Sequence, residues 1–488
     1  MLSPINPMSQ SFNRKVLFLI LINLIIKPVW IFGVERAVQV HAGFEAYGLY
    51  FTLFNFTYLL SLVSDMGINS YNIRLSTQGK KAIISSSHLF SIKLILSSVY
   101  LVLGFILSFL IGYTQEAFYL LVVLLFYQLG SSFLGYLRSY LTGLQRYTAD
   151  AVVSVLDKFL LVILLLPLIY SSYFTDFYFP ISYFAGLQCL AILISILLCI
   201  FLLKGHPIFK IQAFSFLQLK QTLRQLLPYS LFMFLVLAYN KVDSIMLERM
   251  LKNGALESGT YAAAYRLLDA LSMIPILFAS FFYPLLSKLL ADKKEIQTWI
   301  QSSSEVLIAL TIILAISLSL FAKEWMELLY PTKSDLHLIS IFQILIFSII
   351  PIGVYYIFSS ALTANGNLKG LNYIAFASLA LNVMLNLFLI PKEQAWGAAL
   401  ATIISLSFAA LAYIYSYHSV FKVKIKVFLW IKLLVLALLL IAGSIFLKNL
   451  SLFWLLKFAF INLFGLVLMF ILNLIHLKKL ISLFKFTL

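Results

Sequence analysis

Uninterrupted apolar runs of about 20 residues recur along the whole sequence of 488 residues, and a helix of that length crosses the ~30 Å hydrocarbon core of a bilayer. The strands of an outer-membrane barrel would instead alternate apolar and polar residues. Apolar residues make up 62% of the chain and charged residues 11%, where a soluble domain has about 45–50% and about 25%. This excludes a soluble enzyme, a disordered chain and a small disulfide scaffold. We predict an all-α polytopic membrane protein.

The apolar runs define about fourteen predicted transmembrane helices. The longest loop, 204–225, has 22 residues, which leaves no room for a soluble catalytic or nucleotide-binding domain. The predicted spans are 16–33, 46–66, 88–113, 117–137, 149–170, 179–203, 226–247, 260–289, 300–320, 338–362, 371–390, 396–417, 427–446 and 452–477.

The basic residues predict the orientation of the chain. If the N-terminus is cytoplasmic, the inner segments hold 21 Lys and Arg residues and the outer loops hold 7. Lys and Arg concentrate in cytoplasmic loops, so both termini are expected in the cytoplasm. The net charge of +17 then reflects membrane topology, and no nucleic-acid partner is expected.

A weak internal repeat divides the chain. AYGLYFTLFN around Tyr47 is similar to TYAAAYRLLD around Tyr261, at an offset of 214, and Leu141-Thr142-Gly143 is opposite Leu362-Thr363-Ala364 at an offset of 221. Two halves with an even number of spans each are parallel repeats about an axis along the membrane normal. The predicted segments are a cytoplasmic tail 1–15, a first lobe 16–203, a basic linker 204–225, a second lobe 226–417, two extra spans within 427–477 and a tail 478–488.

Ionisable residues within spans are the strongest candidates for function, because each costs ~2.5–3.5 kcal/mol on insertion scales. Five of nine lie in the first, seventh and eighth spans, on helices that also carry polar faces. Two halves that meet at these faces would enclose a polar chamber containing several cations. The nine residues are Lys27, Asp65, Lys93, Asp157, Lys158, Lys241, Asp243, Arg266 and Asp269.

Structural roles stay open for several of these charges. Arg266 and Asp269 lie at i, i+3 and can neutralise one another. Asp157 and Lys158 can pair with neighbouring helices, and a lysine near a span end can reach water through its long side chain. Lys27 has no acid at i±3 or i±4, so it is the best single candidate for a ligand-facing cation.

The segment that starts at Asn240, NKVDSIMLERMLKNGALESGTYAAAYRLLDALSMIPILFASFFYPLLSKL, resembles the start of the second half of Wzx-type flippases. These flippases are the polysaccharide transporters of the multidrug/oligosaccharidyl-lipid/polysaccharide superfamily. The resemblance is carried by the Asp243 segment, by GTYAAAYR ending at Arg266 and by Tyr283-Pro284. ERAVQVHAGFEAYGLY, SDMGINSYNIR and PKEQAWGAALAT are similar too, so the resemblance covers the whole chain.

The resemblance implies two six-helix lobes in a V around a central cavity that opens alternately inward and outward. It implies translocation of a polyprenyl-diphosphate-linked oligosaccharide across the bacterial cytoplasmic (inner) membrane, for cell-surface polysaccharide such as lipopolysaccharide O-antigen. Other polysaccharide-assembly membrane proteins are implied as partners.

By the same resemblance, cavity cations hold the diphosphate. Arg and Lys donate charge-assisted hydrogen bonds to phosphate, so the physical chemistry agrees. Asp243 and Asp269 are candidates for coupling transport to H⁺ or Na⁺, because burial and nearby cations oppose one another at such a carboxylate. No cofactor and no metal site is expected. The candidate diphosphate- or sugar-binding residues are Lys27, Arg36, Asn55, Lys241, Tyr265 and Arg266.

Three other functions stay open. A lipid II-type flippase would also have a cationic cavity. A cation-coupled multidrug exporter of the same superfamily usually has twelve spans and often an acid in the first, where this chain has Lys27. A membrane glycosyltransferase or polymerase generally needs a sizeable extracytoplasmic loop, and the longest outer loop here, 321–337, has 17 residues. The ATP-binding motif G-x-x-x-x-G-K-[ST] is absent, so we expect a transporter driven without ATP rather than an enzyme.

Overall fold

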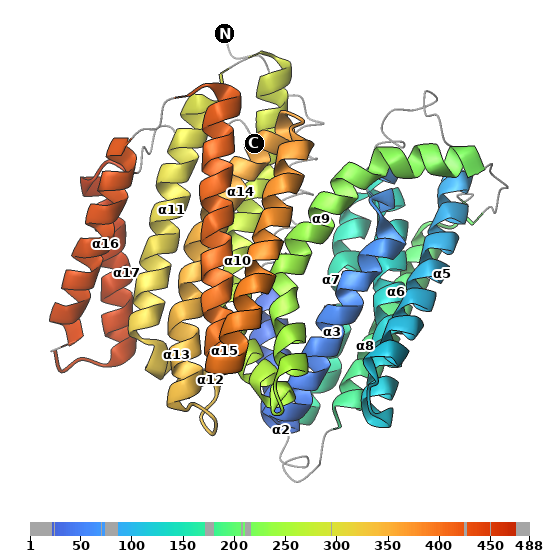
Figure 1. Cartoon of the computed structure of the whole chain (residues 1–488), viewed down its shortest axis with the longest axis horizontal. Coiled ribbons are helices and arrows are strands. Elements are labelled where there is room, and N and C mark those ends of the chain that lie inside the picture. Colours follow the sequence, from blue (N-terminus) through green and yellow to red (C-terminus); the bar gives the residue numbers. More distant parts are fainter. Residues whose placement is uncertain are drawn as a thin grey trace. The chain divides into compact units, whose positions relative to one another are not determined.

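The computed structural model describes residues 22–23, 25–69, 71–73, 86–170, 180–205, 208–209, 216–293, 295–423, 427–448 and 450–474. Within these residues every regular element is a helix (Figure 1). The chain divides into two compact units, Met1–Glu248 and Arg249–Leu488. We call them unit 1 and unit 2.

Unit 1 contains a short π-helix followed by α-helices, of which the last, α9, runs just past the unit limit. The elements are η1 (Val29–Glu35), α2 (Arg36–Ala42), α3 (Phe44–Asp65), α5 (Ser86–Ile111), α6 (Gln115–Gly143), α7 (Tyr147–Tyr170), α8 (Ile181–Leu202) and α9 (Phe216–Met250).

Unit 2 contains the remaining helices. They are α10 (Gly254–Ala291), α11 (Gln297–Leu320), α12 (Ala322–Leu329), α13 (Leu336–Leu345), the 3₁₀ turn η4 (Ile346–Ser348), α14 (Ile349–Ala364), α15 (Leu368–Phe421), α16 (Val427–Lys448) and α17 (Trp454–Ile471).

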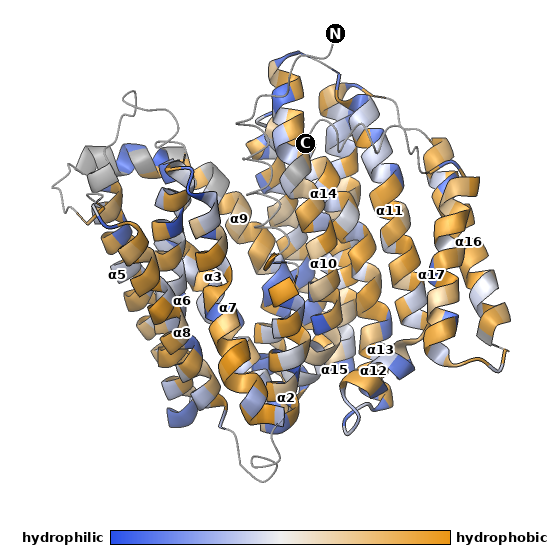
Figure 2. Cartoon of the chain, turned by 180° about the vertical axis from the view of Figure 1, so that it is seen from behind, coloured by the Kyte–Doolittle hydropathy of each residue, from blue (hydrophilic) through white to orange (hydrophobic). Residues whose placement is uncertain are grey.

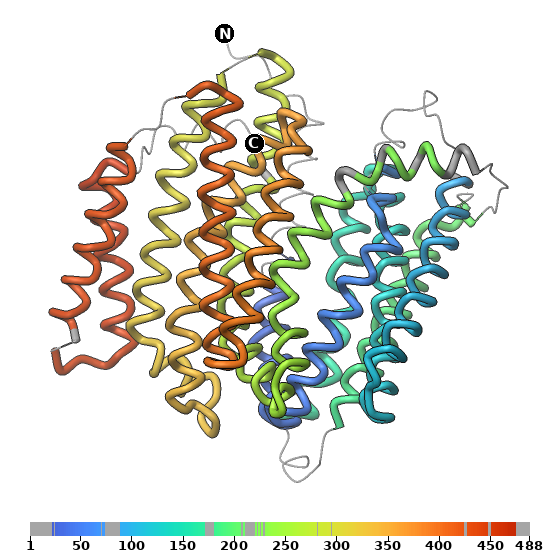
Figure 3. The backbone as a smooth tube through the Cα atoms, viewed as in Figure 1, coloured from blue at the N-terminus to red at the C-terminus, as the bar shows by residue number. Residues whose placement is uncertain are grey.

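Helix α15 is a hairpin of two helices. Its 54 residues would extend about 80 Å at 1.5 Å per residue, far beyond a bilayer. Gln394 has non-helical dihedrals, φ 53° and ψ −133°, and Asn382 Nδ2 donates to Ser405 Oγ at 3.3 Å across 23 residues of sequence. Only a reversal near Gln394 allows that contact, and the trace of α15 shows it (Figure 3).

The structure confirms the predicted fold class. The described residues include 12 helical stretches long and apolar enough to span a membrane, and their ribbons are predominantly hydrophobic (Figure 2). Because α15 contains two predicted spans and α13, η4 and α14 together form one, these stretches cover the second to the fourteenth predicted span. The first, 16–33, lies partly outside the described residues, and its described part is helical.

In unit 1, α6 packs against α3 and α8, and α7 packs against α8 and η1. Buried apolar side chains such as Leu89 of α5, Leu137 of α6 and Cys199 of α8 form a shared core. Leu226 of α9 belongs to the same core. This packing groups α9 with unit 1, although the sequence assigns it to the second lobe. The lobe limits 16–203 and 226–417 stay a prediction.

In unit 2, α14 lies at the centre and contacts α10, α11 and α15. The hairpin of α16 and α17 packs on α11 at one edge of the unit (Figure 1). At Gly465 α17 approaches α11 closely, because a Cβ built there would be 2.8–3.0 Å from the Ile313 side chain. Small residues allow such close packing between membrane helices, and Trp325 of α12 adds an edge contact with Trp454, with ring centroids 5.4 Å apart.

Candidate functional site

A buried hydrogen-bonded contact joins α3 and α9 in unit 1. Asn55 Nδ2 donates to Ser244 Oγ at 2.9 Å, and Thr52 Oγ1 donates to the Ser244 carbonyl at 3.0 Å. All three side chains are buried. Thr52 and Asn55 lie three residues apart on one helix face, so α3 presents both to the same turn of α9. The predicted site residue Asn55 therefore binds a neighbouring helix here.

Lys241 and Asp243 lie on the same turns of α9 as Ser244. Asp243 is 1% exposed, whereas Lys241 is partly exposed. Ser244 Oγ also donates to the Lys241 carbonyl at 3.0 Å. The structure thus brings three predicted site residues, Asn55, Lys241 and Asp243, into one region of unit 1.

Lys27 and Arg36 lie on either side of η1 in unit 1. Lys27 is exposed and lies two residues before the start of η1. Arg36 is the first residue of α2, and its Nη2 donates to the Tyr170 hydroxyl of α7 at 3.4 Å. Tyr170 in turn donates to the Gly33 carbonyl at 3.4 Å. Arg36 is therefore held near the end of α7.

Tyr265 and Arg266 lie on α10 in unit 2, and both are buried. The Arg266 side chain is 5% exposed, and its Nε donates to the Tyr330 hydroxyl at 2.9 Å. The Tyr265 ring stacks on Tyr261, with centroids 5.8 Å apart and planes 25° apart. Tyr330 lies in a predicted loop, where no sequence signal marks it as a partner of a residue 64 positions away.

Asp269 is exposed, unlike its neighbour Arg266. The two residues lie three positions apart on α10, yet their side chains have different environments. Of the eight predicted site residues, five belong to unit 1 and the three on α10, Tyr265, Arg266 and Asp269, belong to unit 2.

Two further cations lie inside unit 1, of which Lys93 is buried and Lys158 is partly buried. Lys93 of α5 is 0% exposed, and its Nζ donates to the Ser64 carbonyl at 2.9 Å and to Ser132 Oγ at 2.6 Å. It therefore joins α5 to α3 and α6. The sequence marks Lys93 as an ionisable residue within a span, but not its partners.

Lys158 of α7 is held by an acid and by aromatic rings. Its Nζ lies 2.6 Å from Asp157 Oδ2 and 3.2 Å from the Tyr127 hydroxyl. It also lies 5.5 Å from the centroid of the Trp30 ring, at cation–π distance. Asp157 and Lys158 therefore pair with one another, and of the predicted contacts with neighbouring helices Lys158 makes one to Tyr127 of α6.

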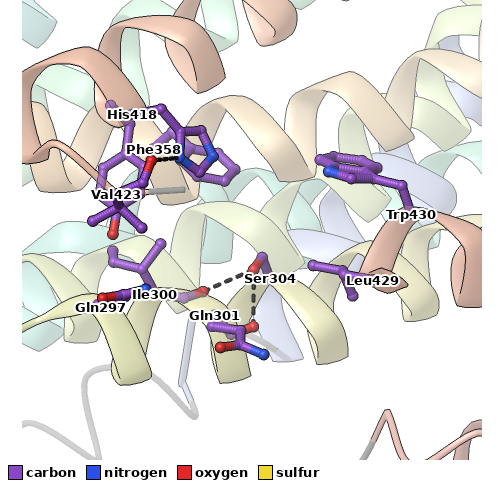
Figure 4. Close-up of a pocket in the computed structure, with 10 residues that line it drawn as sticks. Gln297, Ile300, Gln301, Ser304, Phe358, His418, Val423, Leu429 and Trp430 are labelled. Carbon is purple, nitrogen blue, oxygen red and sulfur yellow. Dashed lines mark hydrogen bonds between the residues drawn. The ribbon is translucent and has the colours of Figure 1, made fainter. Parts of the chain in front are cut away.

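A small pocket lies in unit 2, where α11, α14, α15 and α16 meet. The close-up shows the His418 ring nitrogen Nδ1 bonded to the Val423 carbonyl and Ser304 bonded to backbone carbonyls of its own helix (Figure 4). Trp430 of α16 closes one side. None of the predicted site residues lines this pocket, and the described residues contain no cluster of His, Cys, Asp and Glu that could hold a metal ion.

Comparison with known families assigns the chain. The family model described as polysaccharide biosynthesis protein matches residues 13–290, and the MatE family model matches residues 228–388. The first match covers more than half of the sequence. The chain therefore belongs to the polysaccharide biosynthesis protein family. No curated protein sequence matches the chain.

Solved structures with the same fold are transporters by their titles. A structure titled lipid II flippase MurJ, inward closed conformation, is 18% identical with a TM-score of 0.72, covering 96% of this chain and 99% of that chain. An inward-facing multidrug resistance MATE family transporter of the MOP superfamily is 16% identical with a TM-score of 0.63, covering 81% of this chain and 96% of that chain. A MOP superfamily transporter from Pyrococcus furiosus is 17% identical with a TM-score of 0.53, covering 85% and 95%. The chain thus has the fold shared by these flippases and exporters.

Proposed function

We propose that this protein is an alternating-access flippase that moves a polyprenyl-diphosphate-linked oligosaccharide across the cytoplasmic membrane for cell-surface polysaccharide synthesis. Membership of the polysaccharide biosynthesis protein family supports the pathway. The fold shared with a lipid II flippase supports the transport mode. The observation that carries the proposal is Arg266, a cation that is 5% exposed within the candidate span Gly254–Ala291.

A buried arginine at membrane depth suits an anionic lipid-linked substrate. The guanidinium has five donors, of which Nε binds the Tyr330 hydroxyl. Tyr330 therefore fixes the plane of the guanidinium, and Arg can bind a phosphate through two parallel hydrogen bonds. In the proposed function Arg266, with Lys27, Arg36 and Lys241, binds the diphosphate at successive stages of the cycle. Asn55 and Tyr265 then contact diphosphate or sugar.

The proposal is tested by export from cells that depend on this protein. Arg266→Ala should reduce export of the glycan about 10-fold or more, because a charge-assisted pair contributes roughly 1.5–3 kcal/mol. Arg266→Lys should recover part of the export, since the charge remains and only the paired donor geometry is lost. Arg146→Ala is a matched control, because Arg146 is exposed and donates to the Leu202 carbonyl outside the proposed site.

Normal export by the Arg266→Ala protein at wild-type abundance would refute a diphosphate-binding role for Arg266. Loss of the Arg266→Ala protein from the membrane would assign Arg266 a structural role with Tyr330. The same assay with Lys27→Ala then tests the diphosphate site through a second predicted cation, whose side chain is exposed.

Ion coupling is a separate part of the proposal. Asp243 is buried beside Lys241 on α9, a position from which a carboxylate can bind H⁺ or Na⁺ in one state and release it in another. Asp269 is the second candidate acid. In vesicles, an imposed pH or Na⁺ gradient should speed transport, and Asp243→Asn should abolish the stimulation while basal exchange continues. A rate that no gradient changes would leave both acids as counter-ions of neighbouring cations.

Two other functions have specific support. The MatE match over residues 228–388 favours a cation-coupled multidrug exporter. The likeness to the lipid II flippase favours a lipid II-type substrate. A transport competition between lipid-linked oligosaccharide, lipid II and a cationic drug separates the three, because the proposed function predicts that only the first is the preferred substrate.

A further inference from the structure

A buried acid in unit 2 binds three segments that are distant in sequence. Glu257 lies in the first turn of α10 and is 5% exposed. Its Oε2 accepts hydrogen bonds from His337 Nε2 at 3.0 Å and from the Ala395 backbone N–H at 3.1 Å. Its Oε1 accepts from the Asn253 side chain at 3.4 Å. Glu257 thus connects the starts of α10 and α13 with the turn of the α15 hairpin.

Three helix N-termini converge on this carboxylate. Helix α10 begins at Gly254, α13 begins at Leu336, and the second half of α15 follows the reversal at Gln394. The first N–H groups of a helix have no partner within it and carry partial positive charge. Because Gln394 is non-helical, the Ala395 N–H is such an orphan donor, and Glu257 caps it from another helix. A negative charge here is therefore electrostatically favourable.

His337 is the titratable partner of this cap. It is the second residue of α13, and its side chain is 34% exposed, whereas that of Glu257 is 6% exposed. Glu257 and Asp335 are the two acids whose charge acts on the imidazole, and Asp335 also caps α13 through the Leu338 N–H at 2.8 Å. The partly exposed ring can exchange protons with the surroundings while its acid partner stays buried.

Of the other charged residues on the elements packed against α13, Arg266 of α10 and Glu305 of α11 are buried, but neither is among the charges that act on His337. The remaining ones are mostly exposed. On α12, Lys323 and Glu327 are exposed and lie 3.8 Å apart as an i, i+4 pair, while Glu324 is partly exposed. At the α15 turn, Lys392 and Glu393 are both exposed. Exposed charges are screened by water and salt, so Glu257 and Asp335 dominate the electrostatics at His337.

We propose that Glu257 and His337 form a proton-responsive clasp, by which we mean a hydrogen-bonded pair that restrains the turn of the α15 hairpin. Histidine changes its charge between about pH 5 and pH 8. In acid the imidazolium and Glu257 form a charge-assisted bond, which is stronger than the neutral bond that remains in base. The clasp therefore holds the hairpin turn more firmly in acid and loosens as the pH rises. In the predicted topology these helix starts face the outside, so the clasp responds to external acidity.

A spin label on the hairpin turn tests this proposal. The full-length protein, with Cys189 and Cys199 replaced by Ala, carries the label at Lys392→Cys, an exposed position. Between about pH 5.5 and about pH 8 the mobile fraction of the label should rise severalfold, because the charge on His337 is lost over this range. In His337→Gln the rise should disappear, since glutamine keeps a hydrogen-bond donor without a titrating charge. Glu257→Gln should also flatten the response.

His418→Gln is the matched control. His418 bonds the Val423 carbonyl elsewhere in unit 2, so its loss should leave the pH response of the label intact. A response that persists in His337→Gln, or a wild-type label whose mobility does not change with pH, would overturn the clasp. Because the measurement needs no substrate, its outcome is independent of whether the protein is a flippase.

Discussion

Lys93 places a lysine ammonium, a charged group, within a membrane-spanning helix, where it is completely buried. Its two hydrogen bonds go to the Ser64 carbonyl and to Ser132, and the charge of Asp65 acts on it as well. A buried charge is tolerated when it is paired and hydrogen-bonded. Lys93 therefore holds α3, α5 and α6 together, a structural role rather than a transport role.

We predict that Lys93→Met destabilises the protein although methionine has nearly the same volume. The substitution leaves the Ser64 carbonyl and Ser132 Oγ without their buried donor, and a buried polar group left unsatisfied costs about 1–3 kcal/mol. It also removes the positive charge that acts on Asp65. The melting temperature of the purified protein in detergent should therefore fall. Adding Asp65→Asn should recover part of the loss, since the unpaired charge is then removed. A Lys93→Met protein as stable as wild type would show that the ammonium contributes nothing to folding.

The sequence identifies the cations within membrane spans but not the residues that bind them. Insertion cost alone marks Lys93, Lys158 and Arg266 as residues that need an explanation. The partners Tyr330 and Ser132 are ordinary residues with no local signal, because only tertiary packing brings them to the cation. The Glu257–His337 pair was missed for a related reason: both residues lie in predicted loops, where a charge needs no explanation.

At the scale of elements, the α15 hairpin shows how a short polar segment defines two spans. The sequence predicts spans 371–390 and 396–417, and the structure confirms the break between them at Gln394. Pro391 and the charged residues that follow it interrupt the apolar run. The grouping of α9 with unit 1 could not be predicted, because the hydrogen bonds of Thr52 and Asn55 to Ser244 depend on the packing of distant helices.

We predict that Gln394→Gly stabilises the hairpin. Gln394 has φ 53° and ψ −133°, a conformation that glycine adopts freely and other residues adopt at a cost of order 1–3 kcal/mol. Part of that strain should be recovered as a higher melting temperature in detergent. Nothing in the contact between Glu257 and the Ala395 N–H needs the glutamine side chain.

Gly397→Ala is the matched variant, for which we expect the opposite change in melting temperature. A Cβ at Gly397 would lie 2.5 Å from the Leu389 carbonyl oxygen, so the two arms would have to separate and the melting temperature should fall. An unchanged or lower melting temperature in Gln394→Gly would show that the glutamine conformation carries no strain.

At the scale of the whole molecule, hydropathy was enough to predict an all-helical membrane protein with about fourteen spans, and the orientation expected from Lys and Arg stays a prediction. Motif likeness was enough to predict the family to which the chain belongs. The substrate has no comparable signal, because any anionic lipid-linked molecule would favour cations at membrane depth. Family and fold therefore support the proposed flippase. The identity of the glycan depends on contacts with its sugars, and neither the family nor the fold specifies those contacts.

The most direct test is transbilayer movement in vesicles that contain only this protein. A fluorescent polyprenyl-diphosphate-linked oligosaccharide is incorporated into both leaflets, and an impermeant quencher reports how fast the inner pool reaches the outer leaflet. We expect the wild-type protein to accelerate this movement well beyond protein-free vesicles and vesicles with Arg266→Ala, and to form no new glycosidic bond. Movement no faster than in protein-free vesicles, or elongation of the oligosaccharide, would contradict the proposed flippase.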